Sequence, residues 1–303
     1  MDAPPAIFKP VGRAGFTLVE LSIVLVIIGL IIGGVLVGRD LIAAAAIRSQ
    51  ISQIEKYQTA VNTFRSKYGY LPGDIPSSIV SQFGFTVVPT RAGTQARGDG
   101  NGILEGYGYT GSTVSCCNSN GENAWFWADL ANNSGLIDGS FTTDRDAAYS
   151  SNPAPSAVLP AAKIGANNYL SVGSFNNINY FSISAPVAVS VNGYLYDNGN
   201  PPGIKVVQSY NIDSKIDDGM PQSGGVLARF IDTSIAAGTF VWAAAGGIEG
   251  ANSGSPTYGP TTNSTAPSAT TCYDNNSTTG PQQYSMSQNG GTGQNCALSF
   301  KFQ

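Results

Sequence analysis

The chain has no histidine among its 303 residues, and only 11% of them carry a charged side chain. Without an imidazole a Ser-His-Asp triad is excluded, and no C-x-x-C pair is present to hold zinc. Lys and Arg number 15 against 19 Asp and Glu, so the chain lacks the basic field that replaces the counterions of nucleic-acid phosphates. Neither a G-x-S-x-G elbow nor a G-x-x-x-x-G-K-[ST] phosphate loop occurs. We therefore expect no enzyme, no catalytic residue and no nucleic-acid partner.

Cysteine is also scarce, and its four positions allow three pairings. Cys272 and Cys296 bracket a segment rich in Gly, Ser, Asn and Gln, and closing that loop would restrict the unfolded chain. We therefore expect these two to form a disulfide, which favours an extracytoplasmic location. For the adjacent Cys116 and Cys117, a strained vicinal disulfide, two reduced thiols and pairing outward all stay open.

The chain contains one long apolar run, although its remaining sequence is rich in uncharged polar residues. Residues 16–38 contain Glu20 as their single charged residue and would form about 34 Å of helix, which matches the hydrocarbon thickness of a bilayer. A secretory signal peptide has a shorter apolar core, followed by an A-x-A-like site that is absent here. Residues 1–15 hold three prolines and two basic residues and are predicted to be a leader peptide. Residues 16–38 are predicted to be the transmembrane half of a helix.

The stretch G-F-T-L-V-E at residues 15–20, with the apolar run behind it, resembles the class III signal of type IV pilins and of the pseudopilins of type II secretion. The resemblance implies that a membrane-embedded prepilin peptidase cuts between Gly15 and Phe16 and N-methylates Phe16. It also implies a role for Glu20 in the assembly of a filament with other pilins or pseudopilins. The resemblance covers the amino-terminal part of the chain only.

The position of Glu20 has a physical reading as well. A carboxylate within hydrocarbon costs roughly 2.5–3.5 kcal/mol on insertion scales, so it persists where it has a partner or a function. Cleavage before Phe16 would create a free amino group that can pair with Glu20, either within one helix or between neighbouring helices, and the second arrangement is the assembly model of the family. The alternative is that Glu20 lies at the membrane surface and snorkels to water.

Residues 39–68 continue the helix in amphipathic form. Apolar side chains recur at spacings of three and four residues, which puts them on one helix face: Ile47, Ile51, Ile54, Tyr57, Val61, Phe64 and Tyr68. Gly69 and Pro72 follow and are typical of a helix end. The stripe is short and lacks regular charges beside it, so packing on a head domain is favoured over a coiled coil.

Residues 69–303 are predicted to be a β-rich globular head. Short apolar segments separated by Gly, Pro, Asn and Ser indicate strands at residues 83–89, 177–191, 204–212, 225–231 and 239–245. A short helix is expected at residues 122–137, with Trp125, Leu130 and Ile137 pointing inward. The polar tail, residues 250–296, is expected to be a disulfide-tethered surface loop. The fold class is thus α+β, a pilin-like lollipop with a long N-terminal helix packed on an antiparallel β-sheet.

Two Gly-rich loops gather acidic and amide side chains: Asp99, Asn101 and Glu105 in one, and Asp213, Asp217 and Asp218 in the other. Calcium prefers several oxygen ligands on a flexible loop, and each segment offers some. Neither loop has the twelve-residue EF-hand spacing, and the same residues also form turns in which side-chain oxygens bond nearby backbone amides. Calcium is the one cofactor that the sequence leaves open.

Among functions, the sequence favours a structural subunit of a type IV pilus or pilus-like filament. Such a chain is stored in the inner membrane as a single-pass prepilin, is cleaved and N-methylated, and is assembled through its helix at an inner-membrane platform. It would then lie in an extracellular pilus or a periplasmic pseudopilus. The alternatives are a pseudopilin of a type II secretion system and a membrane-anchored surface binding protein that never polymerises.

Overall fold

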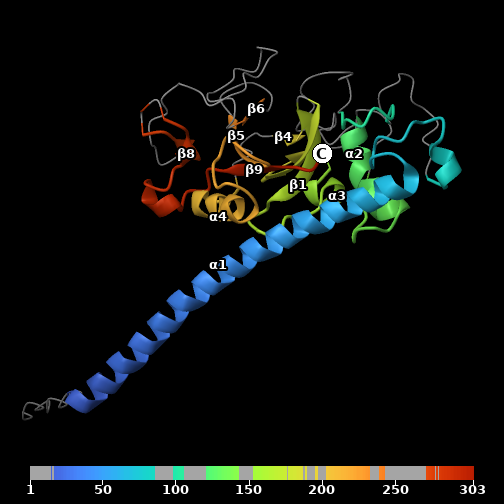
Figure 1. Ribbon diagram of the computed structural model, residues 1–303. Helices are drawn as coiled ribbons and strands as arrows, with labels where there is room; N and C mark the ends of the chain where they lie inside the picture. Colours follow the sequence, from blue (N-terminus) through green and yellow to red (C-terminus); the bar gives the residue numbers. More distant parts are fainter. Residues whose placement is uncertain are drawn as a thin grey trace, which may run out of the picture. The chain divides into compact units, whose positions relative to one another are not determined.

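The computed structural model describes residues 15, 17–85, 98–105, 121–142, 153–175, 177–186, 188–189, 195–196, 203–232, 239–242, 271–276, 278 and 280–303 (Figure 1). The chain divides into two compact units, Met1–Ala45 and Ala46–Gln303. Residues 1–14, which hold nearly all of the predicted leader peptide, lie outside the described residues.

Helix α1 spans Leu18–Tyr68, a stretch of 51 residues that contains no proline. It ends at Gly69, whose backbone N–H donates a hydrogen bond of 2.8 Å to the carbonyl oxygen of Arg65. Gly69 has a φ of +81°, a left-handed conformation that glycine adopts without steric cost. The predicted long helix and its end near Tyr68 are confirmed.

The residues of α1 that belong to the second unit pack on the head with one face. Five members of the predicted stripe are buried, and Ile51 and Tyr68 are half-buried; the buried five are Ile47, Ile54, Tyr57, Val61 and Phe64. Tyr57 contacts the ring of Trp127 edge-on, with 5.1 Å between the ring centroids. The amphipathic pattern therefore identified the face of α1 that joins the core.

The head contains a five-stranded sheet in the order β1-β2-β9-β5-β6, and every neighbouring pair is antiparallel. Its strands are β1 Tyr169–Phe175, β2 Ile178–Ser184, β5 Val226–Asp232, β6 Thr239–Trp242 and β9 Ala297–Lys301. Two short hairpin-like pairs accompany it: β3 Ala188–Val189 with β4 Leu195–Tyr196, and β7 Tyr273–Asp274 with β8 Gln283–Tyr284. The predicted α+β class, with a long helix and an antiparallel sheet, is confirmed.

The remaining elements are short helices. They are η1 Val80–Phe83, α2 Gly121–Ala128, the π-helical turn η2 Asp129–Asn133, α3 Pro155–Val158, α4 Val206–Ile216 and η4 Asn289–Gly291. The helix predicted at residues 122–137 is present as α2 and η2, and its three inward-pointing residues, Trp125, Leu130 and Ile137, are all buried.

One of the predicted strands is wrong. Residues 204–212 form an isolated bridge at Ile204 and then enter helix α4, although their β-branched side chains favour a strand. A helix is more favourable than a strand here because it places four buried side chains on one face, those of Val206, Ser209, Ile212 and Asp213. In a strand the same spacing would put them on both faces. Of the strand predicted at residues 83–89 only 83–85 are described: Phe83 ends the 3₁₀ turn η1, and Gly84 after it has a φ of +73°. Residues 86–89 lie outside the described residues, so a strand there stays a prediction.

The tail is more than a surface loop where it is described. From residue 271 onward it contributes buried side chains, among them Tyr273, Asn275, Gln282 and Tyr284, and it continues into the buried strand β9. Cys272 and Cys296 are joined by a disulfide across 24 positions, with 5.0 Å between their Cα atoms. The sequence predicted a surface loop because the segment is mostly polar, but its aromatic side chains Tyr273 and Tyr284 are buried in the head.

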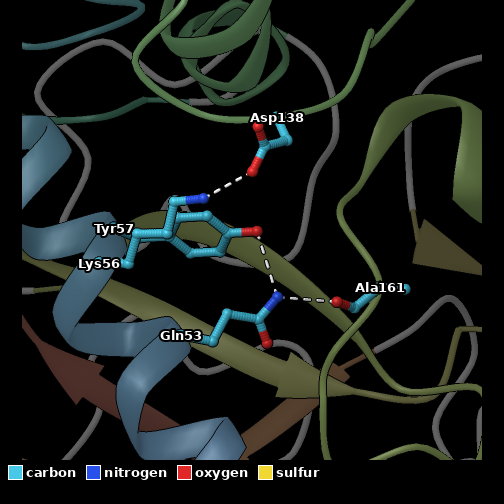
Figure 2. A network of polar contacts seen from close by, with 5 residues as sticks. All are labelled: Gln53, Lys56, Tyr57, Asp138 and Ala161. Carbon is cyan, nitrogen blue, oxygen red and sulfur yellow. Dashed lines mark hydrogen bonds and ion pairs between the residues drawn. The ribbon is translucent and has the colours of Figure 1, made fainter.

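Polar side chains also fasten α1 to the head (Figure 2). The side-chain amide of Gln53 donates to the carbonyl oxygen of Ala161 at 2.9 Å and to the hydroxyl of Tyr57 at 3.2 Å. Its Oε1 accepts a hydrogen bond of 2.9 Å from the backbone N–H of Lys163. Lys56 forms an exposed ion pair with Asp138 at 2.6 Å, and this pair raises the pKa of Lys56 and lowers that of Asp138.

Candidate functional site

In the sequence, the residues predicted for processing lie just before α1, and the residue predicted for assembly lies in its first turn. Gly15 is exposed and has nothing within 4 Å of the position where a Cβ would lie. Phe16, the predicted first mature residue, lies outside the described residues. Glu20 is described, and its carboxylate folds back onto Thr17, the residue directly before the helix.

Thr17 and Glu20 form a reciprocal capping box. The backbone N–H and the hydroxyl of Thr17 each donate a hydrogen bond of 2.8 Å to Oε2 of Glu20. In return the backbone N–H of Glu20 donates to the hydroxyl oxygen of Thr17 at 3.3 Å. The pattern Thr-x-x-Glu is the sequence signature of this motif, and it satisfies two amides that have no partner inside the helix. The role predicted for Glu20 from the sequence was assembly, and no role was predicted for Thr17.

The apolar half of α1 is covered by no other described part of the chain. Its side chains are exposed along the whole run, with Leu18 at 85%, Leu30 at 72% and Ile42 at 72% of their accessible surface. The most apolar 18-residue window has a mean hydropathy of 2.9 and no buried residue, and α1 is the one described helix that is long and apolar enough to cross a membrane. Apolar surface of this extent marks contact with lipid or with other helices.

Three carboxylates from separate segments of the chain form a first acidic cluster. Asp74, Asp99 and Glu122 each place a carboxylate oxygen within 4.8 Å of the other two, and Asp74 and Glu122 are almost fully buried. Burial raises the pKa of Asp74 to about 6, and it raises the pKa of Glu122 well above its usual range. Among the described residues no Lys or Arg forms an ion pair with this cluster.

Backbone amides already bind parts of this cluster. The N–H groups of Gly100 and Gly102 donate to the two carboxylate oxygens of Asp74 at 2.8 and 2.7 Å. The N–H of Glu105 donates to Oε2 of Glu122 at 2.8 Å. Asp74 therefore organises the loop of residues 98–105 around itself.

The outcome for the three residues predicted in this loop is mixed. Asp99 lies in the cluster, whereas the side chain of Asn101 bonds to Asp99 and to the backbone N–H of Ile103, as in an Asx turn. Glu105 contributes its backbone N–H to Glu122 and its carboxylate is buried nearby. Sequence analysis missed Asp74 and Glu122, because each is remote in sequence from the loop that it meets.

The second cluster brings together all three residues that the sequence predicted, Asp213, Asp217 and Asp218. Most of their carboxylate oxygens accept hydrogen bonds, chiefly from residues of the turn between α4 and β5. Asp213 accepts hydrogen bonds from the hydroxyl of Tyr284 at 2.7 Å and from the N–H of Gly219 at 3.2 Å. Burial raises the pKa of Asp213 to about 7.

The two exposed members of the second cluster bind local groups. Asp217 accepts from the N–H groups of Gly225 and Val226, and Asp218 accepts from the N–H of Met220 and the hydroxyl of Ser223. These are hydrogen bonds of the kind that Asp forms within turns, and they engage carboxylate oxygens that would be needed as metal ligands.

The position of Cys116 and Cys117, within residues 106–120, lies outside the described residues, so their predicted alternatives stay predictions.

Comparison with known proteins points to the same end of the chain as the capping box. Residues 12–36 match the family model described as the prokaryotic N-terminal methylation motif. The match supports a type IV pilin-like prepilin, and it implies processing by prepilin peptidase and assembly with other pilins. Together with the apolar helix, it is consistent with membrane anchoring. No curated protein and no solved structure matches the chain.

Proposed function

We propose that this chain is a structural subunit of a type IV pilus or pilus-like filament, held in the inner membrane as a prepilin and assembled through α1. The observation that carries the proposal is the exposed apolar half of α1, which begins within the methylation motif and has one carboxylate in its first turn. A simple membrane anchor needs neither the cleavable junction nor the acid.

Assembly on this proposal is an exchange of apolar partners. In the membrane the side chains of α1 contact lipid, and in the filament the same side chains contact neighbouring helices. Because lipid tails are as apolar as leucine, the gain comes from close packing between helices. Gly29, Gly33, Gly34 and Gly38 leave open space where a Cβ would lie, so neighbouring helices can approach closely there.

Glu20 would set the position of each new subunit. Removal of the leader after Gly15 exposes an amino group on Phe16, and that cation can pair with Glu20 of a neighbour. In a low-dielectric surrounding an unpaired charge is costly, so helices that leave Glu20 without its partner are disfavoured. The charge thereby selects one stagger among the many that an apolar helix allows.

The decisive experiment places the chain in a filament or outside one. In the cells that make the protein, surface filaments are sheared off and the chain is detected in them by immunogold electron microscopy and mass spectrometry. We expect wild-type chain in the filaments, and Glu20→Ala chain that is cleaved normally but stays in the membrane. The matched control is Ser22→Ala in the same helix turn. Filament incorporation of Glu20→Ala at the wild-type level would contradict the assembly role.

The pseudopilin alternative has its own readout. A pseudopilin would be missing from sheared surface filaments, and deletion of its gene would block the export of folded proteins while leaving surface pili intact. A surface binding protein that never polymerises would remain in the membrane fraction with or without Glu20. The same fractionation therefore separates all three functions.

A further inference from the structure

The capping box at the start of α1 binds the carboxylate of Glu20 asymmetrically. Both donors of Thr17, its backbone N–H and its hydroxyl, converge on Oε2 at 2.8 Å. Oε1 accepts no hydrogen bond from any described residue. One oxygen is therefore held against the helix, and the other is free to accept a bond from outside it.

We propose that Thr17 is the positioning residue for Glu20, which it holds so that Oε1 faces the amino group of an incoming neighbour. The inference rests on the proposed role of Glu20 in filament assembly and adds a second residue to that role. Thr17 does not itself meet the neighbour. It acts by fixing the rotamer of Glu20 and by supplying two hydrogen bonds to a charge in apolar surroundings.

The hydroxyl of Thr17 is the part of the box that a side chain can change. It donates to Glu20 and accepts from the backbone N–H of Glu20, so one group both steadies the carboxylate and satisfies an amide of the first turn. Within hydrocarbon no water can replace these bonds, and an unsatisfied amide there is costly. Loss of the hydroxyl would leave Glu20 with one donor and several rotamers.

Three substitutions in the full-length chain separate the cap from the charge. Thr17→Val keeps the shape of the side chain and removes the hydroxyl, whereas Thr17→Ser keeps the hydroxyl. Glu20→Gln keeps a side chain that can close a capping box and removes the charge. Each variant is expressed in the cells that make the protein, and the amount in sheared filaments is divided by the amount of cleaved chain in the membrane. This ratio removes any effect of Thr17, which lies close to Gly15, on cleavage.

We expect Thr17→Val to lower the ratio severalfold, Thr17→Ser to restore it to the wild-type level, and Glu20→Gln to abolish incorporation. A wild-type ratio for Thr17→Val, with Glu20→Gln still inactive, would overturn the role of Thr17 and leave that of Glu20 standing. A wild-type ratio for Glu20→Gln would instead overturn the proposed function of the charge itself. Equal losses in Thr17→Val and Thr17→Ser would also overturn the inference, because the hydroxyl would then not be the group that matters.

A second measurement tests the geometry without assembly. The full-length chain in lipid nanodiscs is analysed by amide hydrogen exchange at the first turn of α1. If the hydroxyl of Thr17 binds the N–H of Glu20, exchange at Glu20 should be faster in Thr17→Val and unchanged in Thr17→Ser. Equal exchange in all three chains would contradict the capping box.

Discussion

The backbone N–H of Ile164 donates a buried hydrogen bond of 2.9 Å to Oε1 of Gln50, a residue 114 positions earlier in the chain. The side chain of Gln53, one turn further along α1, binds the same segment through Ala161 and Lys163. Two glutamines on an otherwise apolar helix face thus fix the register of α1 against this loop, because hydrogen bonds have one geometry where apolar contacts allow sliding.

We expect Gln53→Ala to destabilise the head more than Gln50→Ala. Gln53 makes three hydrogen bonds, and its loss removes the partner of the Ala161 carbonyl and of the Lys163 N–H, which costs about 0.5–1.5 kcal/mol for each bond. Gln50 makes one, and its own Nε2 has no hydrogen-bond partner, so its removal relieves part of the cost. Urea denaturation of the full-length chain in detergent measures the difference. Gln58→Ala, at an exposed position of the same helix, is the control, and equal effects of the two buried glutamines would contradict the prediction.

Stability of the head should fall as the pH rises from about 4 to about 7. Burial raises the pKa of Asp213 to about 7, and the hydroxyl of Tyr284 and the nearby carboxylates of Asp217 and Asp218 face it. Because the folded state holds this proton more tightly than the unfolded chain, the contribution is full below about pH 4 and is lost by about pH 7. The raised pKa of Asp74, about 6, acts in the same direction.

The measurement is a series of melting temperatures between about pH 4 and pH 8 for wild type and Asp213→Asn. The asparagine variant keeps an acceptor for Tyr284 and cannot ionise, so its melting temperature should change less with pH. Parallel curves for the two chains would contradict the role of Asp213. Glu55→Gln, at an exposed carboxylate of α1 outside both acidic clusters, is the control.

Calcium binding stays a prediction of the sequence, and the structure makes its test specific. If calcium binds at the first cluster, it should raise the melting temperature of the full-length chain at neutral pH, and chelator should reverse the rise. Asp74→Asn should then remove the effect, whereas Asp218→Asn in the second cluster should not. An unchanged melting temperature with calcium and with chelator would rule out a stabilising site in either cluster.

Gly15→Ala should block maturation. The resemblance of residues 15–20 to class III signals implies cleavage after this glycine. The exposed position of Gly15 leaves space for the added methyl group, so the expected effect is on recognition by the peptidase and not on folding. Mass spectrometry of the membrane-bound chain should show the leader retained and no added N-methyl group. Normal mature mass for this variant would overturn the assigned junction. Gly29→Ala, within the apolar run, is the matched control.

Local patterns predicted the parts of the fold that depend on one segment. The apolar run and the spacing of three and four residues predicted helix α1, and Gly69 predicted where it ends. Both features depend on residues that are neighbours in the sequence, so they can be predicted from one segment. The helix at α2 was also predicted, since its buried aromatic side chains lie close together in sequence.

Long-range contacts were not accessible in the same way. Asp74 and Glu122 come together across 48 positions, and nothing in either local stretch indicates the other. The segment at Ile204 read as a strand because β-branched residues begin it, and only packing against the disulfide-linked tail makes α4 the better solution. The capping box at Thr17 could have been predicted from the sequence pattern Thr-x-x-Glu. It was missed because Glu20 was interpreted from its charge alone.

The position of β9 in the sheet governs when the head can fold. β9 lies between β2 and β5, so a strand from residues 297–301 joins two strands that are synthesised well before it. The central ladders cannot close until these residues have left the ribosome. By then all residues of α1 have been in the chain for most of the time that its synthesis takes. Helix α1 is thus complete while the head is still an open chain, and a chain that lacks β9 would leave β2 and β5 with unpaired edges that favour aggregation.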